Sequence, residues 1–169
     1  YQGESNAHNM DAHEQLFRLL VDSWRSNWKN PEMPFYFVQL SSLNRPSWTW
    51  FRDSQLRLMK SIPNTGMAVS SDQGDSLDVH PTHKQPVGER LGRWALNQTY
   101  GHAVTPSGPI YNNVVKEGNH LVVSFTYGDG LRTSDGKSPS CFEIAEEDGL
   151  FYPALVKIEG SKVRLSSPE

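Results

Sequence analysis

A run of six residues, Phe35-Tyr-Phe-Val-Gln-Leu40, places the strongest constraint on the fold of this chain. The run has the length of a strand, and it does not alternate strictly between apolar and polar residues. This pattern is typical of a strand that is buried on both faces, as in parallel sheets covered by helices. The run therefore favours a parallel α/β sheet.

The segments around this run have the patterns that such a sheet requires. Apolar residues recur at helical spacing from Asn9 to Trp28, and Asn9 or Asp11 can cap this helix. A second helix fits Ser47 to Ser61, and Gly66 to Ser70 follows as another short buried strand. The order helix, strand, helix, strand indicates parallel strands that are joined by helical crossovers.

The character of the sequence changes after Gly101. A third helix fits Pro86 to Tyr100, all five tryptophans precede Gly101, and no helical period follows it. Four strand candidates then alternate with Gly/Asp turns: His120 to Tyr127, Cys141 to Ile144, Tyr152 to Ile158 and Lys162 to Leu165. We therefore expect an α/β domain of residues 1–104 and a small antiparallel β domain of residues 105–169.

Charge and composition exclude several classes of partner. The formal net charge of −3 offers no electrostatic reason to bind nucleic acid or an anionic membrane. The longest apolar runs are far shorter than the roughly 18 residues that a membrane-spanning helix needs. The single cysteine, Cys141, excludes an intramolecular disulfide, and its apolar surroundings favour a buried position over a reactive thiol.

Two loops contain the residues most suited to chemistry, because ligands of open α/β sheets bind beyond the carboxyl ends of strands. In the loop after the second strand, Asp78-x-His80 can place a carboxylate at one ring nitrogen, which leaves the other nitrogen to act as a base. The alternative is a loop histidine that bonds only nearby backbone. Near the start of the chain, Gln2 and Gly3 can direct N–H groups at an oxyanion, unless the loop only caps the following helix.

Together the two loops resemble the sialate O-acetylesterase group of the SGNH-type carbohydrate esterases. The resemblance is carried by Tyr1-Gln-Gly-Glu-Ser-Asn-Ala7, Ser70-Ser-Asp-Gln-Gly-Asp75, Asp78-Val-His-Pro-Thr-His-Lys84 and Val87-Gly-Glu-Arg-Leu91. The order of later segments is also similar to that of the family, so the resemblance covers nearly all 169 residues.

The resemblance implies an α/β/α, flavodoxin-like hydrolase domain in which a serine attacks an acetyl ester on a sugar, without a cofactor or metal. This chain would be the C-terminal part of that domain, followed by the small β unit. His80 matches the catalytic histidine and Asp78 its neighbouring carboxylate, while Gln2, Gly3 and Glu4 match a block that borders the active site. The family also favours a secreted, periplasmic or lysosomal location.

The chain departs from the family pattern at the nucleophile. In the family the serine lies in a Gly-Gln-Ser-Asn-like segment well before the Gln-Gly-Glu block, and no Gly-Gln-Ser-Asn occurs in this sequence. We therefore expect the chain to begin inside a larger protein, to depend on the missing N-terminal segment as a partner, and to be inactive alone. More distant SGNH enzymes place the carboxylate three residues before the histidine, where this chain has Leu77, so Asp72 and Asp75 stay open as substitutes for Asp78.

The same and neighbouring residues suggest three other uses. Gly3-Glu-Ser-Asn-Ala7 approximates a nucleophile elbow, with Ser5, Asp78 and His80 in α/β-hydrolase order, but only four residues precede Ser5 and an elbow needs a leading strand. The histidine pairs His8/His13 and His80/His83 lack the spacing of a metal site. Trp48, Trp50 and Phe51 could stack on sugars, although aromatic residues at a helix start are more often core.

Two functional classes remain. One is an esterase part that acts on an acetylated sugar, and the other is a noncatalytic carbohydrate-binding or scaffold module that could include the C-terminal β unit. The identity of the sugar stays open between acetylated sialic acids and other acetylated glycans. Arg45, Arg52 and Arg90 could bind a sialate carboxylate, but arginines pair with structural carboxylates at least as often.

Overall fold

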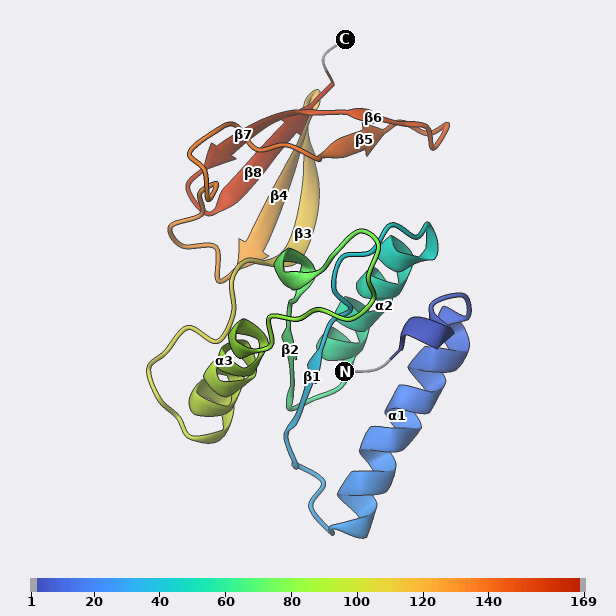
Figure 1. The fold of residues 1–169 in the computed structure, drawn as a ribbon. Helices are drawn as coiled ribbons and strands as arrows, with labels where there is room; N and C mark the ends of the chain where they lie inside the picture. Colours follow the sequence, from blue (N-terminus) through green and yellow to red (C-terminus); the bar gives the residue numbers. More distant parts are fainter. Residues whose placement is uncertain (1–2, 168–169) are drawn as a thin grey trace. The chain divides into compact units, whose positions relative to one another are not determined.

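The apolar run at Phe35 forms one strand of a parallel pair. In the computed structural model, which describes residues 3–167, β1 (Phe35–Val38) pairs with β2 (Thr65–Ala68), and Phe35 lies opposite Thr65 (Figure 1). The chain divides into two compact units, Tyr1–Pro106 and Ser107–Glu169, and this parallel pair belongs to the first. The α/β class predicted from the sequence is confirmed.

Helices α2 (Ser47–Ser61) and α3 (Gln85–Trp94) cover opposite faces of the two strands (Figure 1). The Thr65 hydroxyl donates to a carbonyl near the end of α2 at 2.8 Å. The next residue, Gly66, faces the Trp94 ring, and the Trp94 indole N–H donates to a β2 carbonyl at 2.9 Å. Since successive side chains of a strand point to opposite faces, the two helices enclose β2 from both sides.

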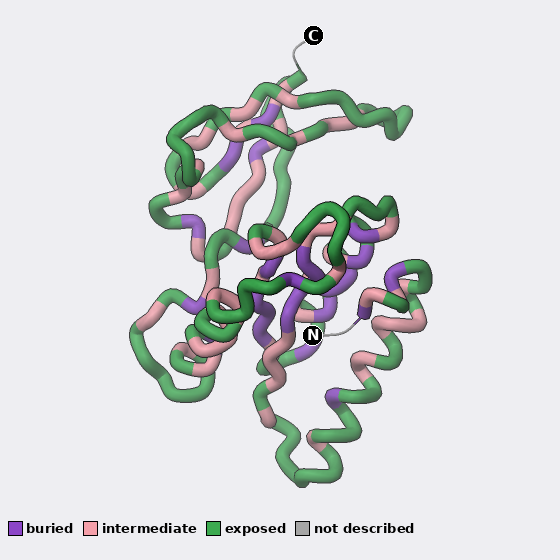
Figure 2. The backbone as a smooth tube through the Cα atoms, viewed as in Figure 1, coloured by how far each residue is buried: buried purple, intermediate pink, exposed green. Residues whose placement is uncertain are grey.

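Helix α1 (Met10–Asn27) begins at an Asn9 N-cap, whose side chain accepts the backbone N–H of Ala12 at 3.2 Å. Val21 of α1 is fully buried in a cluster with Leu58 and Ile62 at the end of α2. The rest of α1 is only partly covered, whereas buried residues concentrate on the strands and α2 (Figure 2). Helix α1 therefore lies on the same face of the strands as α2.

The aromatic residues at the start of α2 have divided roles. Trp48 and Phe51 are 2% and 0% exposed, in agreement with the core position expected for them. Trp50 is 63% exposed, so its expected core position was wrong. The helical period explains the difference, because it directs residue 50 away from the face shared by residues 48 and 51.

Beyond α3, the helix predicted to reach Tyr100 continues as a π-helical turn, Ala95–Thr99.

The second unit is antiparallel, as expected. Its larger sheet has the strand order β3-β4-β8-β7, and a separate hairpin pairs β5 with β6. The strands are β3 (Ile110–Glu117), β4 (His120–Thr126), β5 (Glu143–Ala145), β6 (Phe151–Pro153), β7 (Leu155–Glu159) and β8 (Lys162–Ser166). Val122, Val163 and Leu165 are its buried residues in β4 and β8.

None of the helices that the structure describes is long and apolar enough to cross a membrane.

Two expectations for the second unit were wrong. The strand expected from Tyr152 to Ile158 is interrupted at Ala154, whose N–H donates to the carbonyl of Phe142 at 2.9 Å. This interruption lets β6 pair with β5 while β7 pairs with β8. Cys141 is exposed rather than buried, because it lies before β5 with a φ of 63° and so falls outside the alternation of the strand.

We expect Gly66→Ala to destabilise the first unit, because the added Cβ would lie 2.5 Å from the Trp94 ring. Overpacking of this kind costs about 1–3 kcal/mol. Gly92→Ala in α3 is the matched control, since a Cβ there meets nothing within 4 Å, and it should stabilise by roughly 0.5–1 kcal/mol. Tryptophan fluorescence during urea unfolding reports on this unit alone, because all five tryptophans precede residue 107. Equal effects of the two substitutions would contradict the packing argument.

Candidate active site

The loops after β1 and β2 start at the carboxyl ends of these parallel strands, and hydrogen bonds join the two loops. The buried Ser70 hydroxyl donates to the carbonyl of Gln39 at 2.7 Å. At Gly74 the loops approach so closely that a Cβ would lie 2.3 Å from the backbone nitrogen of Ser42. Glycine at this position therefore permits the loop after β2 to lie against the loop after β1.

This loop brings Asp78 and His80 together. One carboxylate oxygen, Oδ1 of Asp78, accepts the backbone N–H of His80 at 2.9 Å and lies 3.3 Å from Nδ1 of its ring. The bond to the backbone N–H, followed by that to the ring, holds the pKa of Asp78 below its ordinary value. Both side chains are exposed, and Nε2 of His80 has no hydrogen-bond partner among residues 3–167. With the Nδ1 proton donated to the carboxylate, Nε2 has a free lone pair that can accept a proton.

The two other carboxylates of the loop are engaged elsewhere. Oδ1 of Asp75 accepts the backbone N–H groups of Leu77 and Asp78 at 2.7 and 3.2 Å, which shapes the turn before the histidine. Asp72 makes a bidentate pair with Arg90 of α3, at 2.6 and 2.7 Å. The geometry of the described residues therefore pairs His80 with Asp78 among the three candidate carboxylates.

Arg90 ties the end of β2 to α3. Besides Asp72, its guanidinium donates to the carbonyl of Val69 at 2.7 Å. The hydrogen bonds from Arg90 hold the pKa of the Asp72 carboxyl far below its ordinary value. Arg90 was expected either to bind a sugar carboxylate or to pair with a structural carboxylate. Asp72 could not be named as its partner from the sequence, because eighteen residues separate the two in the chain.

The segment at the start of the chain forms a tight turn. Gln2 lies outside the described residues, so its predicted position at the oxyanion is not placed. Gly3 is buried with a φ of 141°, its carbonyl accepts the Asn6 N–H at 2.8 Å, and a short 3-10 helix, Glu4–Asn6, follows. A Cβ on Gly3 would lie 2.8 Å from the Phe51 ring, so this turn requires glycine for both space and φ.

One apolar cluster supports both predicted site segments. Ala7, Leu40, Trp48 and Phe51 are buried together, and Val79 packs against them. Ala7 closes the turn that begins at Gly3, whereas Val79 lies between Asp78 and His80 in the chain. The two segments, distant in sequence, therefore pack against the same apolar cluster.

The described part of the chain does not assemble a complete hydrolytic site. No serine hydroxyl in residues 3–167 makes a hydrogen bond to the His80 ring, and Ser5 is exposed in the 3-10 helix. In the same range there is no group of three or more His, Cys, Asp or Glu side chains able to hold a metal ion. What the described residues offer is an exposed histidine that contacts a carboxylate, beyond the carboxyl ends of the strands.

Comparisons with known proteins identify the family of the chain. The model of a family described as "carbohydrate esterase, sialic acid-specific acetylesterase" matches residues 1–99. The crystal structure of a carbohydrate acetylesterase from Xanthomonas citri is similar over 99% of this chain, with a TM-score of 0.92 and 31% identity. This chain spans 41% of the length of that protein. No curated protein matches.

The Asp72–Arg90 pair should make the stability of the first unit depend on pH. The pKa of Asp72 is depressed in the folded state from its ordinary value of 3.8, so its contribution is present above that value and is lost as the pH falls toward the folded pKa. Because the Asp72 side chain is half exposed, we expect Asp72→Asn to cost only about 1 kcal/mol at pH 7. The difference from the wild type should shrink steadily below about pH 4.

The measurement is urea unfolding between pH 2 and pH 7, followed by tryptophan fluorescence. Asp22→Asn is the control, because Asp22 is an exposed residue of α1 without a partner among the described residues. A stability difference for Asp72→Asn that persists unchanged to pH 2 would show that its carboxylate charge is not what stabilises the loop.

Proposed function

Because the chain belongs to the family of sialic acid-specific carbohydrate acetylesterases, we propose that it contributes the general base of a hydrolase that removes acetyl groups from sugar hydroxyls. The observation that carries this proposal is the Asp78–His80 pair in the loop beyond the carboxyl end of β2. Both side chains are exposed, and Nε2 of His80 has no hydrogen-bond partner among the described residues. Family membership supports esterase activity in general. The assignment of roles to these residues is our own.

In the proposed reaction, Nε2 of His80 takes the proton of a serine hydroxyl as its oxygen attacks the acetyl carbonyl. Asp78 keeps the imidazole in the required tautomer and stabilises the imidazolium that forms. The tetrahedral intermediate collapses when the imidazolium protonates the departing sugar oxygen. A water molecule, activated by the same histidine, then releases acetate from the acyl-serine.

We assign the serine to a segment that precedes Tyr1 in the full protein, because Gly-Gln-Ser-Asn does not occur in the sequence and Gly3-Glu-Ser-Asn6 matches a different block of the family. The length of the Xanthomonas citri acetylesterase is consistent with such a segment, since this chain spans 41% of it. Gln2, Gly3 and Glu4 would border the reacting carbonyl, where N–H donors stabilise a developing oxyanion. On this proposal the substrate is an acetylated sugar, and the isolated chain lacks its nucleophile.

A noncatalytic carbohydrate-binding module is the second candidate. The observation in its favour is the hairpin of β5 and β6, where Phe151 and Tyr152 are exposed aromatic side chains of the kind that stack on sugar rings. Binding of a glycan by the full protein, without release of acetate from any acetylated form, would favour this candidate over the esterase.

The first test of the esterase is acetate release by the full-length protein and by the isolated 169-residue chain. We expect activity only in the full-length protein, and His80→Ala should lower its kcat by about 10⁴-fold or more. His83→Ala is the control, since His83 is also exposed in this loop but has no partner among the described residues. A loss below about tenfold for His80→Ala would exclude it as the general base. Acetate release by the isolated chain that Ser5→Ala abolishes would instead place the nucleophile at Ser5.

The second test identifies which of the three carboxylates of the loop orients His80. Asp78→Asn should preserve the fold but leave the histidine in the wrong tautomer, with a loss of up to about 10⁴-fold in kcat. Asp75→Asn and Asp72→Asn should have much smaller effects, because their oxygens bond the turn and Arg90. The assay is kcat for all three variants in the full-length protein, at a pH where the histidine is neutral. A large loss at Asp72 or Asp75 with a silent Asp78 would move the carboxylate role to that residue.

A further inference from the structure

Arg45 is a cationic side chain in the loop that follows β1, close to the loop that contains Asp78 and His80. The two loops are joined beside it, because the backbone N–H of Asn44 donates to the carbonyl of Ser76 at 3.0 Å. Asn44 directly precedes Arg45, and Ser76 lies two residues before Asp78. This junction places a positive charge next to the segment that contains the proposed general base.

The Arg45 side chain is held in place without being neutralised. Its guanidinium carbon lies 5.3 Å from the centre of the Trp48 ring, within the range of a cation–π contact. Trp48 is buried, and its indole N–H donates to the carbonyl of Ser41 at 2.6 Å. Arg45 itself is exposed, and it forms no ion pair with a carboxylate of residues 3–167. The guanidinium is therefore fixed by the ring and open to an anion from solvent.

Trp48 also relates Arg45 to the proposed catalytic pair. The Trp48 ring belongs to the buried cluster against which Val79 packs. Val79 lies between Asp78 and His80 in the chain. The arginine and the pair are therefore anchored on the same cluster, so the position of one relative to the other is defined by packing.

Two other arginines of the first unit are less suited to bind a ligand. Arg90 is already engaged by both carboxylate oxygens of Asp72. Arg52 of α2 is half-buried, and its Nε is buried without a hydrogen-bond partner among the described residues. Because this Nε is closed to solvent, a ligand cannot bond to it without displacing the side chains around it. Of these three arginines, Arg45 is the one that is both exposed and unpaired.

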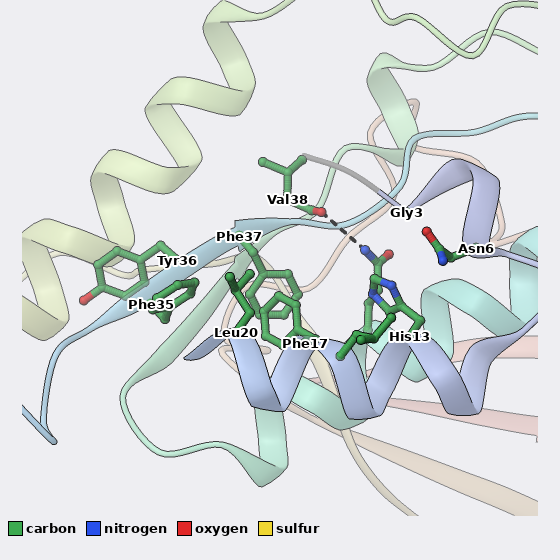
Figure 3. A pocket seen from close by; sticks show the side chains of 11 residues that line it. Gly3, Asn6, His13, Phe17, Leu20, Phe35, Tyr36, Phe37 and Val38 are labelled. Carbon is green, nitrogen blue, oxygen red and sulfur yellow. Dashed lines mark hydrogen bonds between the residues drawn. The ribbon is translucent and has the colours of Figure 1, made fainter. Parts of the chain in front are cut away.

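The groove between α1 and β1 offers no comparable group for an acidic ligand. It has a volume of about 420 Å³, and mainly apolar side chains face into it, among them Phe17, Leu20 and Phe37 (Figure 3). No lysine or arginine of residues 3–167 lines it. Burial lowers the pKa of His13, so this lining histidine is neutral near pH 7. A carboxylate in the groove would lack a counter-ion, which favours the exposed loop at Arg45.

We propose that Arg45 binds a carboxylate group on the sugar, so that the site prefers acetylated sugars that are acidic, such as acetylated sialic acids, over neutral ones. A guanidinium forms two parallel hydrogen bonds with a carboxylate, and the contact with Trp48 holds this guanidinium in place before the ligand binds. Asp75 and Asp78 of the neighbouring loop would repel an acidic sugar unless a cation faced it. This inference rests on the proposed esterase function and adds the class of sugar to it.

The first test compares one sugar with and without its negative charge. The substrates are O-acetylated N-acetylneuraminic acid and its methyl ester, and the measurement is kcat/KM for acetate release by the full-length protein. We expect the wild type to prefer the acid by about tenfold or more, and Arg45→Gln to remove most of this preference through KM. Arg45→Lys should be intermediate, because it keeps the charge but loses the paired hydrogen bonds. A wild type without this preference would overturn the proposal.

Two further arginine variants serve as controls. Arg57→Gln removes the same charge from α2, but Arg57 is paired with Glu14 and Asp53, so the preference for the acid should stay as in the wild type. Equal losses on both substrates for Arg45→Gln would show that Arg45 only supports the loop, and the proposal would be wrong. The proposal would also be wrong if Arg52→Gln, and not Arg45→Gln, removed the preference.

Binding of the deacetylated sugar separates a failure of this proposal from a failure of the esterase. The ligand is N-acetylneuraminic acid, and its Kd for the full-length protein is measured by calorimetry, which does not depend on turnover. Arg45→Gln should raise this Kd about tenfold, and Arg57→Gln should leave it unchanged. Acetate release from neutral sugars together with a Kd that ignores Arg45 would overturn this proposal alone. A Kd that depends on Arg45 without acetate release from any ester would overturn the esterase and keep the assignment of Arg45.

Discussion

The contact between the loops after β1 and β2 is the constraint on which the candidate site depends. Two contacts hold the loops together directly beyond the strands. The backbone of Gly74 lies close to that of Ser42, and the buried Ser70 hydroxyl donates a hydrogen bond to the carbonyl of Gln39. A buried hydrogen bond of this kind contributes on the order of 1 kcal/mol, and its loss would leave a buried carbonyl unpaired at further cost. The position of the Asp78–His80 pair relative to the sheet follows from this contact.

The carboxylates of one loop have different roles because their surroundings differ. Asp72 meets a guanidinium and secures the loop to α3, whereas Asp75 meets two backbone N–H groups and shapes the turn. Asp78 is the carboxylate that reaches an imidazole. Each oxygen that is already bonded to a structural donor is less available to histidine, and this division of hydrogen bonds selects Asp78 as the proposed orienting group.

The sequence predicted the elements whose burial is periodic. Helix α2 was expected from Ser47 to Ser61 and has those bounds, and β1 and β2 lie within a residue or two of their predicted positions. The predictions failed where burial is weak or irregular. Strand β3 was not predicted because nearly all its residues are exposed and its register shifts near Asn113, so no alternation marks it. Cys141 was misplaced because its positive φ takes it out of the strand pattern.

The sequence by itself determined the α/β class, the antiparallel character of the second unit, the family and the local Asp78–His80 spacing, since each depends on neighbouring residues or on a short pattern. Only the tertiary structure decided which carboxylate faces His80, that Arg90 is paired with Asp72, and that Ala7 and Val79 share one cluster. It also exposed the groove beside β1. These features join residues from separate segments, and periodicity along the chain carries no information about which distant side chains will share a hydrogen bond or a surface.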